Sequence, residues 1–319
     1  MVMASVFIDG QAGTTGLLIK ERLTARPDIT LLEIDPEQRK DAGAKQDIID
    51  AADVVILCLP DEAAIKTVAA CTNSHTRFID ASTAHRTHPD WTYGFPEMTT
   101  EQRSNIVSAR YISNPGCYPT GFLAGVKPLI DESILDSGAL ISINAISGYS
   151  GGGRQMIESY EAREAMFPDS LWYSRPYSLG LQHKHVPEMT RYSGLSTSPI
   201  FQPSVGHFYQ GMLVSIPIAQ AQFTKRMGLS DIHAVLAARY ESETCIKVHA
   251  PNDESPLTDG FLDPQGANGT NRLDLMLFGH DEQMVLIARL DNLGKGASGA
   301  AVQNMNLVLG IDEMEGLRS

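Results

Sequence analysis

The sequence predicts two kinds of fold in one chain: an α/β domain with a parallel sheet, followed by an α+β domain with a mixed or antiparallel sheet. Strand and helix signals alternate over the first third of the 319 residues. Over the second half, long strands are joined by short polar turns such as residues 279–282. Parallel strands need long crossovers, usually helical, whereas short turns join antiparallel strands. A third observation is the glycine-rich turn at residues 10–16, directly after the first strand.

This first strand and its turn form the pattern of a dinucleotide-binding fingerprint. Residues 6–9 are mostly apolar, the turn has the spacing G-x-x-G-x-x-G, and a segment with helical spacing follows. Glycines let the backbone approach a pyrophosphate, whose charge the helix N-terminus binds. The spacing is one residue off the commonest form, and a plain tight turn is the alternative. The first domain is thus predicted to be of the Rossmann type, with these candidate cofactor-binding residues: Gly10, Gly13, Thr14, Thr15 and Gly16.

Further elements are expected from the apolar pattern along the chain. The first domain should have strands at residues 30–34, 53–59, 77–81 and 105–112, with a helix from Asp61 onward. The second should have strands at residues 139–146, 211–218, 245–249, 272–279 and 283–290, few helices, and an irregular loop at 251–271. A last helix is expected at 297–309, with apolar positions that would pack on another element.

Composition excludes several classes of function. The formal net charge is −13 without a basic run, which argues against partners such as nucleic acid or an anionic membrane surface. The four cysteines form no C-x-x-C pair and no zinc spacing, so no metal site and no disulfide framework are expected. The N-terminus lacks the basic and apolar regions of a signal peptide, and no apolar run reaches the ~20 residues of a membrane helix. These features predict a cytoplasmic protein.

One cysteine stands where a Pro-Gly turn meets a helix-like segment. Cys117 lies within Ser-Asn-Pro-Gly-Cys-Tyr-Pro-Thr-Gly, residues 113–121, and Pro119 suits a first helical turn. An apolar stripe follows at Phe122, Leu123, Val126, Leu129 and Ile130. The free N–H groups and positive dipole end of a helix N-terminus lower a thiol pKa and stabilise a nearby oxyanion. The alternative is a small, inert residue in a tight turn.

Together, the glycine turn and Cys117 indicate a thiol that forms an acyl-enzyme and a nicotinamide that reduces or oxidises it. Two other classes remain open at this point. A cysteine hydrolase needs a thiol and a histidine but no dinucleotide, and a nucleotide-sensing regulator would carry a dead site.

Six strings of residues, in order along nearly the whole chain, resemble the N-acetyl-gamma-glutamyl-phosphate reductase family in its shorter form, within the semialdehyde dehydrogenase group. They lie at residues 10–16, 80–86, 114–120, 147–154, 183–188 and 291–299. The strings Asn-Pro-Gly-Cys-Tyr-Pro-Thr and His-x-His-x-Pro-Glu are the most specific of them. A related semialdehyde dehydrogenase that acts on another acyl phosphate is the alternative, because the sequence does not reveal the length of the substrate.

The resemblance implies reduction of N-acetyl-glutamyl 5-phosphate by NADPH to the 5-semialdehyde with release of phosphate, a step of arginine biosynthesis. It also implies an NADP-binding domain at residues 1–114 and 297–319, and a catalytic and oligomerisation domain at 115–296. The C-terminal helix would return to the first domain, and the protein would be a homotetramer.

Cys117 is the expected nucleophile, because its thioester would accept a hydride where a free carboxylate would not. His185 is the candidate acid/base and Glu188 would orient its ring. His183, a candidate substrate ligand, is two residues away, so on a strand the two histidines would face the same way. Which of the two is the acid/base stays open.

Arginines and amides complete the expected site. Arg86 and Arg154 could each bind the substrate's carboxylate or phosphate with a planar guanidinium, and Asn114 joins them as a substrate ligand. By resemblance, Asn292 and Gly294 contact the nicotinamide end of the cofactor.

Two departures from the family bear on these roles. Asp35 follows the second strand, where an acidic residue favours NAD, whereas Arg39 and Lys40 could meet the 2′-phosphate of NADP. The longer family form has an arginine where this chain has Gln210, so any role of that arginine is absent or moved.

Overall fold

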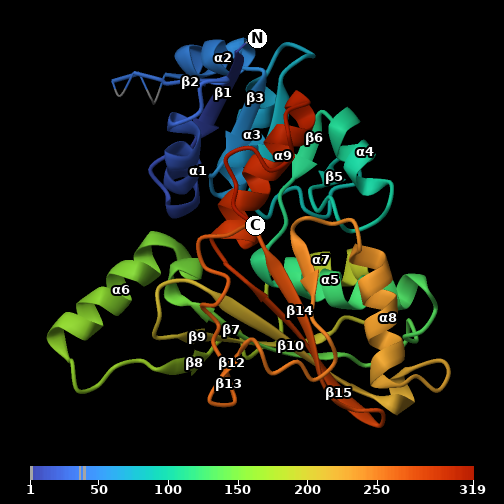
Figure 1. Cartoon of the computed structure of the whole chain (residues 1–319). Coiled ribbons are helices and arrows are strands. Elements are labelled where there is room, and N and C mark those ends of the chain that lie inside the picture. Colours follow the sequence, from blue (N-terminus) through green and yellow to red (C-terminus); the bar gives the residue numbers. More distant parts are fainter. Residues whose placement is uncertain (1–2, 36, 39–40) are drawn as a thin grey trace. The chain divides into compact units, whose positions relative to one another are not determined.

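The computed structural model describes residues 3–35, 37–38 and 41–319, and the chain divides into two compact units (Figure 1). Unit 1 comprises Met1–Gly116 and Ala297–Leu317. Unit 2 comprises Cys117–Gly296 and Arg318–Ser319. Over the described ranges, no helix is both long and apolar enough to cross a membrane.

Unit 1 is built on a six-stranded sheet in the order β2-β1-β3-β4-β6-β5, with every pair parallel. The strands are β1 (Ala4–Asp9), β2 (Ile29–Leu32), β3 (Val54–Leu57), β4 (Arg77–Asp80), β5 (Thr92–Tyr93) and β6 (Tyr111–Ser113). The helices are α1 (Thr14–Thr24), α2 (Ala42–Ala51), α3 (Asp61–Ala70), α4 (Gln102–Ser108) and α9 (Gly299–Leu309). The strand order reverses beside β1, and open parallel sheets bind ligands at such a point.

Helices cover both faces of this sheet because its strands are apolar on both sides. Along β1, Val6 and Ile8 face one core and Phe7 faces the other. The first core includes side chains of α1, α4 and α9, and the second includes side chains of α2 and α3. The C-terminal helix α9 therefore packs within unit 1, where it contacts α4, β4 and α1, as predicted.

One predicted element of unit 1 is wrong. The expected strand at residues 105–112 is the end of α4 followed by β6. Ile106 is fully buried in the core that α4 shares with α9, whereas Val107 is exposed. A short β-branched run cannot be assigned by periodicity alone, and here packing of Ile106 decides for the helix.

Unit 2 is built on a seven-stranded mixed sheet in the order β11-β14-β15-β10-β7-β9-β8. The strands are β7 (Ser142–Gly148), β8 (Ser174–Pro176), β9 (Ile200–Gly206), β10 (Met212–Ala219), β11 (Ile246–Val248), β14 (Leu273–His280) and β15 (Gln283–Leu290). Only the pairs β7–β9 and β11–β14 are parallel among the described strands of this sheet. The predicted fold class, a parallel α/β domain followed by a mixed-sheet α+β domain, is confirmed.

Unit 2 has more helices than the apolar pattern predicts. They are α5 (Cys117–Asp131), α6 (Gly153–Met166), α7 (Val186–Ser193) and α8 (Leu229–Tyr240), with short turns η1 (Tyr149–Gly152), η2 (Gln220–Gln222) and η3 (Gly294–Ser298). The expected loop at 251–271 is irregular except for a small hairpin, β12 (Leu257–Thr258) and β13 (Phe261–Leu262).

Helix α5 lies directly on the sheet of unit 2 and contacts β10, β14 and β15. Its glycines allow this close packing. A methyl group at Gly125 would overlap the side chain of Leu286, and one at Gly121 would press on Val214. The N-terminus of α5, where Cys117 lies, is thereby fixed relative to the sheet.

Candidate functional site

The glycine turn of unit 1 has the geometry of a phosphate-binding loop. Gly10 has φ of +90°, and a methyl group there would overlap the backbone oxygen of Cys58. A methyl group at Gly16 would overlap the backbone of Gly10. Gly13 is the N-cap of α1, and Thr14 and Thr15 begin the helix. Because no side chain caps this helix among the described residues, its first N–H groups are available to an anion. The loop therefore fits the pyrophosphate of a dinucleotide.

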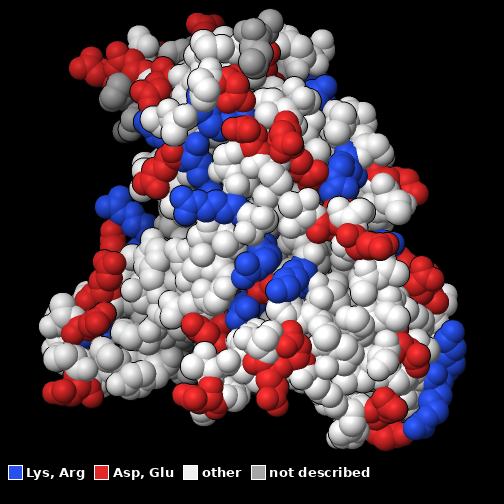
Figure 2. Space-filling model, in the orientation of Figure 1, with Lys and Arg blue, Asp and Glu red and all other residues white. Residues whose placement is uncertain are grey.

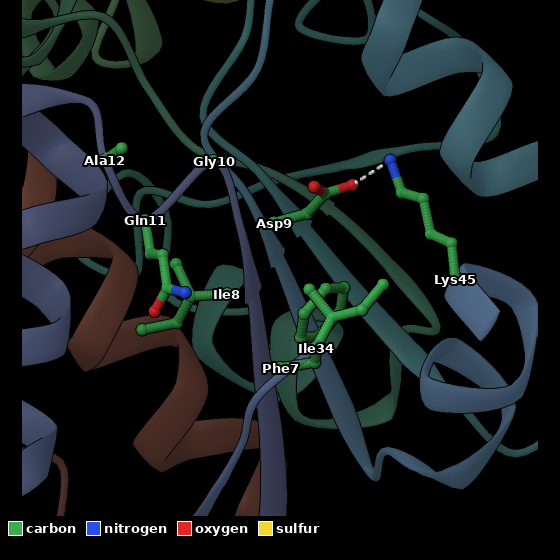
Figure 3. A pocket seen from close by; sticks show the side chains of 8 residues that line it. All are labelled: Phe7, Ile8, Asp9, Gly10, Gln11, Ala12, Ile34 and Lys45. Atoms are coloured by element: carbon green, nitrogen blue, oxygen red, sulfur yellow. Dashed lines mark ion pairs between the residues drawn. The ribbon is translucent and has the colours of Figure 1, made fainter. Parts of the chain in front are cut away.

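A pocket of about 130 Å³ lies beside this turn (Figure 3). It is lined by Phe7, Ile8, Asp9, Gly10, Gln11, Ala12, Ile34 and Lys45. Figure 3 shows the side chains of Asp9 and Lys45 pointing toward one another, and the Nζ atom of Lys45 lies 2.6 Å from Oδ2 of Asp9. Thr67 also donates a hydrogen bond to Oδ2 of Asp9, at 3.0 Å. Lys45 is thus a cation at the cofactor loop that the sequence pattern did not single out.

Of the residues expected to determine the preference for NAD or NADP, only Asp35 is among the described residues. Arg39 and Lys40 lie outside the described residues. Asp35 is exposed, and its Oδ1 accepts a hydrogen bond from the backbone N–H of Glu37, which holds it in a turn.

Two of the other cysteines, Cys58 and Cys71, have raised thiol pKa values. The pKa of the Cys58 thiol is raised to about 12, first by burial and then by the charges of Asp80 and Asp9. Burial and a hydrogen bond with Asp50 raise the pKa of Cys71 as well. Both thiols therefore stay protonated at neutral pH, and a protonated thiol is a poor nucleophile.

Cys117 has the position expected of a nucleophile. It is half-buried, and it is the first residue of α5, as predicted. A methyl group at Gly296 would come within 2.7 Å of its Cβ atom, so η3 packs tightly against it. Lys295, next to Gly296, is almost fully buried.

His183 and His185 do not lie on a strand, so the strand geometry that would turn both to one side does not apply. His185 is the N-cap of α7, and His183 lies in the turn before it. Pro187 ends any strand here, because it favours the first turn of a helix. The two rings lie edge to face with their centroids 4.7 Å apart. Both also contact the ring of Tyr118, the residue after Cys117, at 5.9 and 5.8 Å.

Tyr118 thus brings the two histidines to the beginning of α5. Glu188 is buried in the first turn of α7, three residues after His185. Positions three residues apart share one side of a helical turn, which suits the orienting role predicted for this carboxylate.

Arg86 and Asn114 belong to unit 1 and are joined to one another. The Nε atom of Arg86 donates to the backbone oxygen of Asn114 at 3.1 Å, and an Nη atom donates to that of Ala81. The amide of Asn114 donates to the backbone oxygen of Ala297. These bonds fix the segment that precedes Cys117 in the chain.

Arg154 has a different environment, at the beginning of α6 in unit 2. Its side chain is 77% exposed and forms an ion pair with Glu158 at 2.7 Å. Figure 2 shows acidic and basic side chains intermixed over one face of the molecule.

Asn292 lies in the loop before η3, and Gly294 is the first residue of η3. Asn292 is buried, accepts a hydrogen bond from the backbone N–H of Gly211 and donates one to Ser150. Gly294 is needed because a methyl group there would overlap the backbone oxygen of Thr270. The amide of Gln210 donates to Asp291 at 2.8 Å, so this residue supports the same loop.

Comparison with known proteins identifies the family. Residues 10–106 match the model "Semialdehyde dehydrogenase, NAD binding domain", and residues 117–292 match "Semialdehyde dehydrogenase, dimerisation domain". N-acetyl-gamma-glutamyl-phosphate reductase 2 of Nostoc sp. is 49% identical over 98% of both chains. The enzyme named N-acetyl-gamma-glutamyl-phosphate reductase in Brucella suis is 46% identical over 96% of this chain and 98% of its own. The chain belongs to this reductase family.

Membership of this family makes the chain an oxidoreductase, and its first domain model indicates a nicotinamide dinucleotide as cofactor. Solved structures agree on the fold. Aspartate semialdehyde dehydrogenase II of Vibrio cholerae has a TM-score of 0.74 at 15% identity, with 97% of this chain and 99% of that chain covered. Aspartate semialdehyde dehydrogenase of Candida albicans, solved with NADP, has a TM-score of 0.65 at 15% identity, with 97% and 99% covered.

Proposed function

We propose that this chain reduces N-acetyl-L-glutamyl 5-phosphate to N-acetyl-L-glutamate 5-semialdehyde with NADPH, through a thioester on Cys117, as a step of arginine biosynthesis. The observation that supports it most is the placement of Cys117 at the N-terminus of α5, with two histidine rings packed on the adjacent Tyr118. The names of relatives at 46–49% identity support the substrate.

The chemistry follows from the position of the thiol. His185 takes the Cys117 proton, and the thiolate attacks the acyl carbon of the substrate. The bond between that carbon and the phosphate oxygen breaks, phosphate leaves and takes a proton from solvent, and a thioester remains. A bound nicotinamide dinucleotide supplies the hydride, two electrons and a proton, that reduces the thioester carbon.

The protein's own groups complete the reaction. The N–H groups of the first turn of α5 stabilise the oxyanion, and His185 gives it a proton. The carbon–sulfur bond then breaks as the aldehyde forms, and the hydroxyl proton returns to the sulfur by way of His185. Glu188 orients the imidazole.

Several further roles are part of this proposal. The cofactor is bound by the domain at residues 1–114 and 297–319. The domain at 115–296 carries the catalytic groups and forms the contacts of a homotetramer. The protein works in the cytoplasm. The dimerisation-domain match supports oligomerisation. The substrate is bound by Arg86, Asn114, Arg154 and His183. The cofactor is contacted by Asn292 and Gly294.

The experiment that tests the function runs the reaction in reverse. Purified protein with N-acetylglutamate 5-semialdehyde and NADP should produce NADPH only when phosphate is present. NADPH formation without phosphate, or none with this aldehyde and rapid formation with a shorter one, would contradict the proposal. A hydrolase would release a free acid without any change in the dinucleotide.

Lys45 supports the preference for NADPH. It lines the pocket of the glycine turn together with Ile34, which follows β2, where the adenosine ribose of a Rossmann cofactor is held. Lys45→Gln should lower the ratio of kcat/KM for NADPH to that for NADH by about ten- to a hundredfold, because a hydrogen bond to a charged group contributes ~1.5–3 kcal/mol.

Lys20→Gln is the matched control, since Lys20 is a lysine of the same unit whose ion pair with Glu33 is exposed. It should leave the ratio unchanged. An equal loss for both cofactors in Lys45→Gln would mean that the lysine binds a part common to NADPH and NADH, and not the 2′-phosphate.

Arg154 is expected to bind the substrate and not the cofactor. Its exposed ion pair with Glu158 is worth little, so the guanidinium can turn to a substrate anion at small cost. Arg154→Ala should raise KM for the acyl phosphate by on the order of a hundredfold, and Arg154→Lys should restore only part of this. Arg226→Ala, which removes another exposed ion pair of unit 2, is the control. A weaker affinity for NADPH with unchanged KM would place Arg154 at the cofactor.

A further inference from the structure

A tyrosine outside the predicted site joins the side chains around Cys117. Tyr177 follows β8, and its Oη atom lies 3.3 Å from Oη of Tyr118 and 3.4 Å from Nε2 of His183. We propose that Tyr177 is a positioning residue that holds His183 in the tautomer with its proton on Nε2, which leaves the acid/base role to His185. This inference rests on the proposed function.

The tautomer follows from the partners of the two ring nitrogens. The Nδ1 atom of His183 accepts a hydrogen bond from the backbone N–H of His185 at 3.1 Å. A ring nitrogen that accepts a hydrogen bond carries no proton, so a neutral His183 has its proton on Nε2. The Nε2–H group then donates to Tyr177, whose hydroxyl donates to Tyr118.

This arrangement makes His183 a poor acceptor of the Cys117 proton. A proton on Nδ1 would point at the backbone N–H of His185, so two donors would face each other and this hydrogen bond would be lost. The Nε2 atom already carries its proton. His183 could act as a base only by breaking its bond to the chain at His185, whereas the His185 side chain takes no part in that bond.

The two phenols keep their protons at neutral pH, as the hydrogen-bond chain requires. Burial raises the pKa of Tyr177 to about 12, against a lowering by its bond to Tyr118, and a negative charge on Cys117 raises it further. Burial likewise raises the pKa of Tyr118, as do Tyr177 and Cys117. Tyr177 is therefore a hydroxyl donor while Cys117 is a thiolate.

Aromatic packing holds the His183 ring in place. Its ring lies edge to face with those of Tyr177 at 5.6 Å, Phe201 at 5.2 Å and Tyr118 at 5.9 Å. The chain between Tyr177 and His183 includes Ser178 and Leu181 with positive φ, and Leu181 is exposed. Such a segment has little packing of its own, so its shape depends on the bonds at its two ends.

The test reads the tautomer directly. Long-range ¹H–¹⁵N correlation spectra of the full chain, with His183 assigned by loss of its signals in His183→Asn, should show Nε2 protonated and Nδ1 not. In Tyr177→Phe, which keeps the ring and removes one hydroxyl, the Nε2 shift should change, while the backbone N–H of His185 still keeps the proton off Nδ1. The ratio kcat/KM should fall about three- to tenfold, the size of one lost hydrogen bond.

Tyr173→Phe is the matched control. Tyr173 is 71% exposed and lies four residues before Tyr177, and this substitution also removes a single hydroxyl. It should change neither the spectrum nor kcat/KM. A wild-type spectrum with the proton on Nδ1, or shifts in Tyr177→Phe that equal those of the wild type, would overturn the inference. The spectra need no substrate, so failure to reduce the acyl phosphate would count against the proposed function alone.

Discussion

Cys117→Ser should abolish turnover and leave the fold and NADPH binding intact. A hydroxyl has nearly the size of the thiol, so α5 and its contacts with η3 should be preserved, but it is a far weaker nucleophile at neutral pH. The helix N-terminus that favours a thiolate cannot ionise an alcohol to a comparable extent. The kcat should fall below about one per cent of the wild-type value, a loss of ~3 kcal/mol or more in transition-state stabilisation.

Cys71→Ser is the matched control, since Cys71 is also partly exposed and its thiol stays protonated. It should keep full activity. Iodoacetamide at neutral pH should label Cys117 before Cys71 and Cys58, and acyl phosphate should protect Cys117. Activity of Cys117→Ser above about one per cent, with a normal fold, would contradict the covalent route.

The parallel sheet of unit 1 could be predicted because its strands are short, apolar and separated by regular helical segments. The glycine turn could be predicted for a physical reason as well. Both Gly10 and Gly16 stand where a side chain would overlap backbone atoms, so the residue type itself carries the geometry. Cys117 was placed at a helix start by the Pro-Gly turn before it and by Pro119 after it, and it begins α5.

Helix α6 shows why other elements could not be predicted. Only Tyr160 is buried along its length, and most of its other positions are polar or exposed, although Met156 and Ile157 are partly buried. A helix without an apolar stripe leaves no periodic signal in the sequence. Lys45 was missed for a related reason: α2 has one buried side chain, Ile49, so no helix was expected there to carry the lysine to the pocket.

The partners of the histidines also depend on tertiary structure. Tyr177 and Tyr118 are 59 residues apart in the sequence, and no spacing rule connects them. The two-residue separation of the histidines does not by itself distinguish a strand from a helix start. The proline two residues after His185 was the available signal for a helix start instead.

His185→Asn should lower kcat by roughly two to four orders of magnitude, the usual effect of a lost general acid/base. Asparagine keeps a polar amide at this position, the N-cap of α7, and lacks the imidazole. The backbone N–H of residue 185 would still donate to His183, so the variant removes the imidazole and little else. The pH profile of kcat/KM should lose the limb that depends on the His185 imidazole.

His280→Asn, at an exposed position of β14 in the same unit, should behave like the wild type and control for histidine loss in general. His183→Asn should have a smaller effect than His185→Asn, because His183 has its Nδ1 atom bound to the chain and its Nε2 atom to Tyr177. Affinity for NADPH, measured by fluorescence titration, should be similar in all three variants. If His183→Asn loses more activity and also the neutral limb of the pH profile, the roles of the two histidines are exchanged. The difference in activity between the two variants therefore shows which imidazole transfers the proton and which one positions the loop.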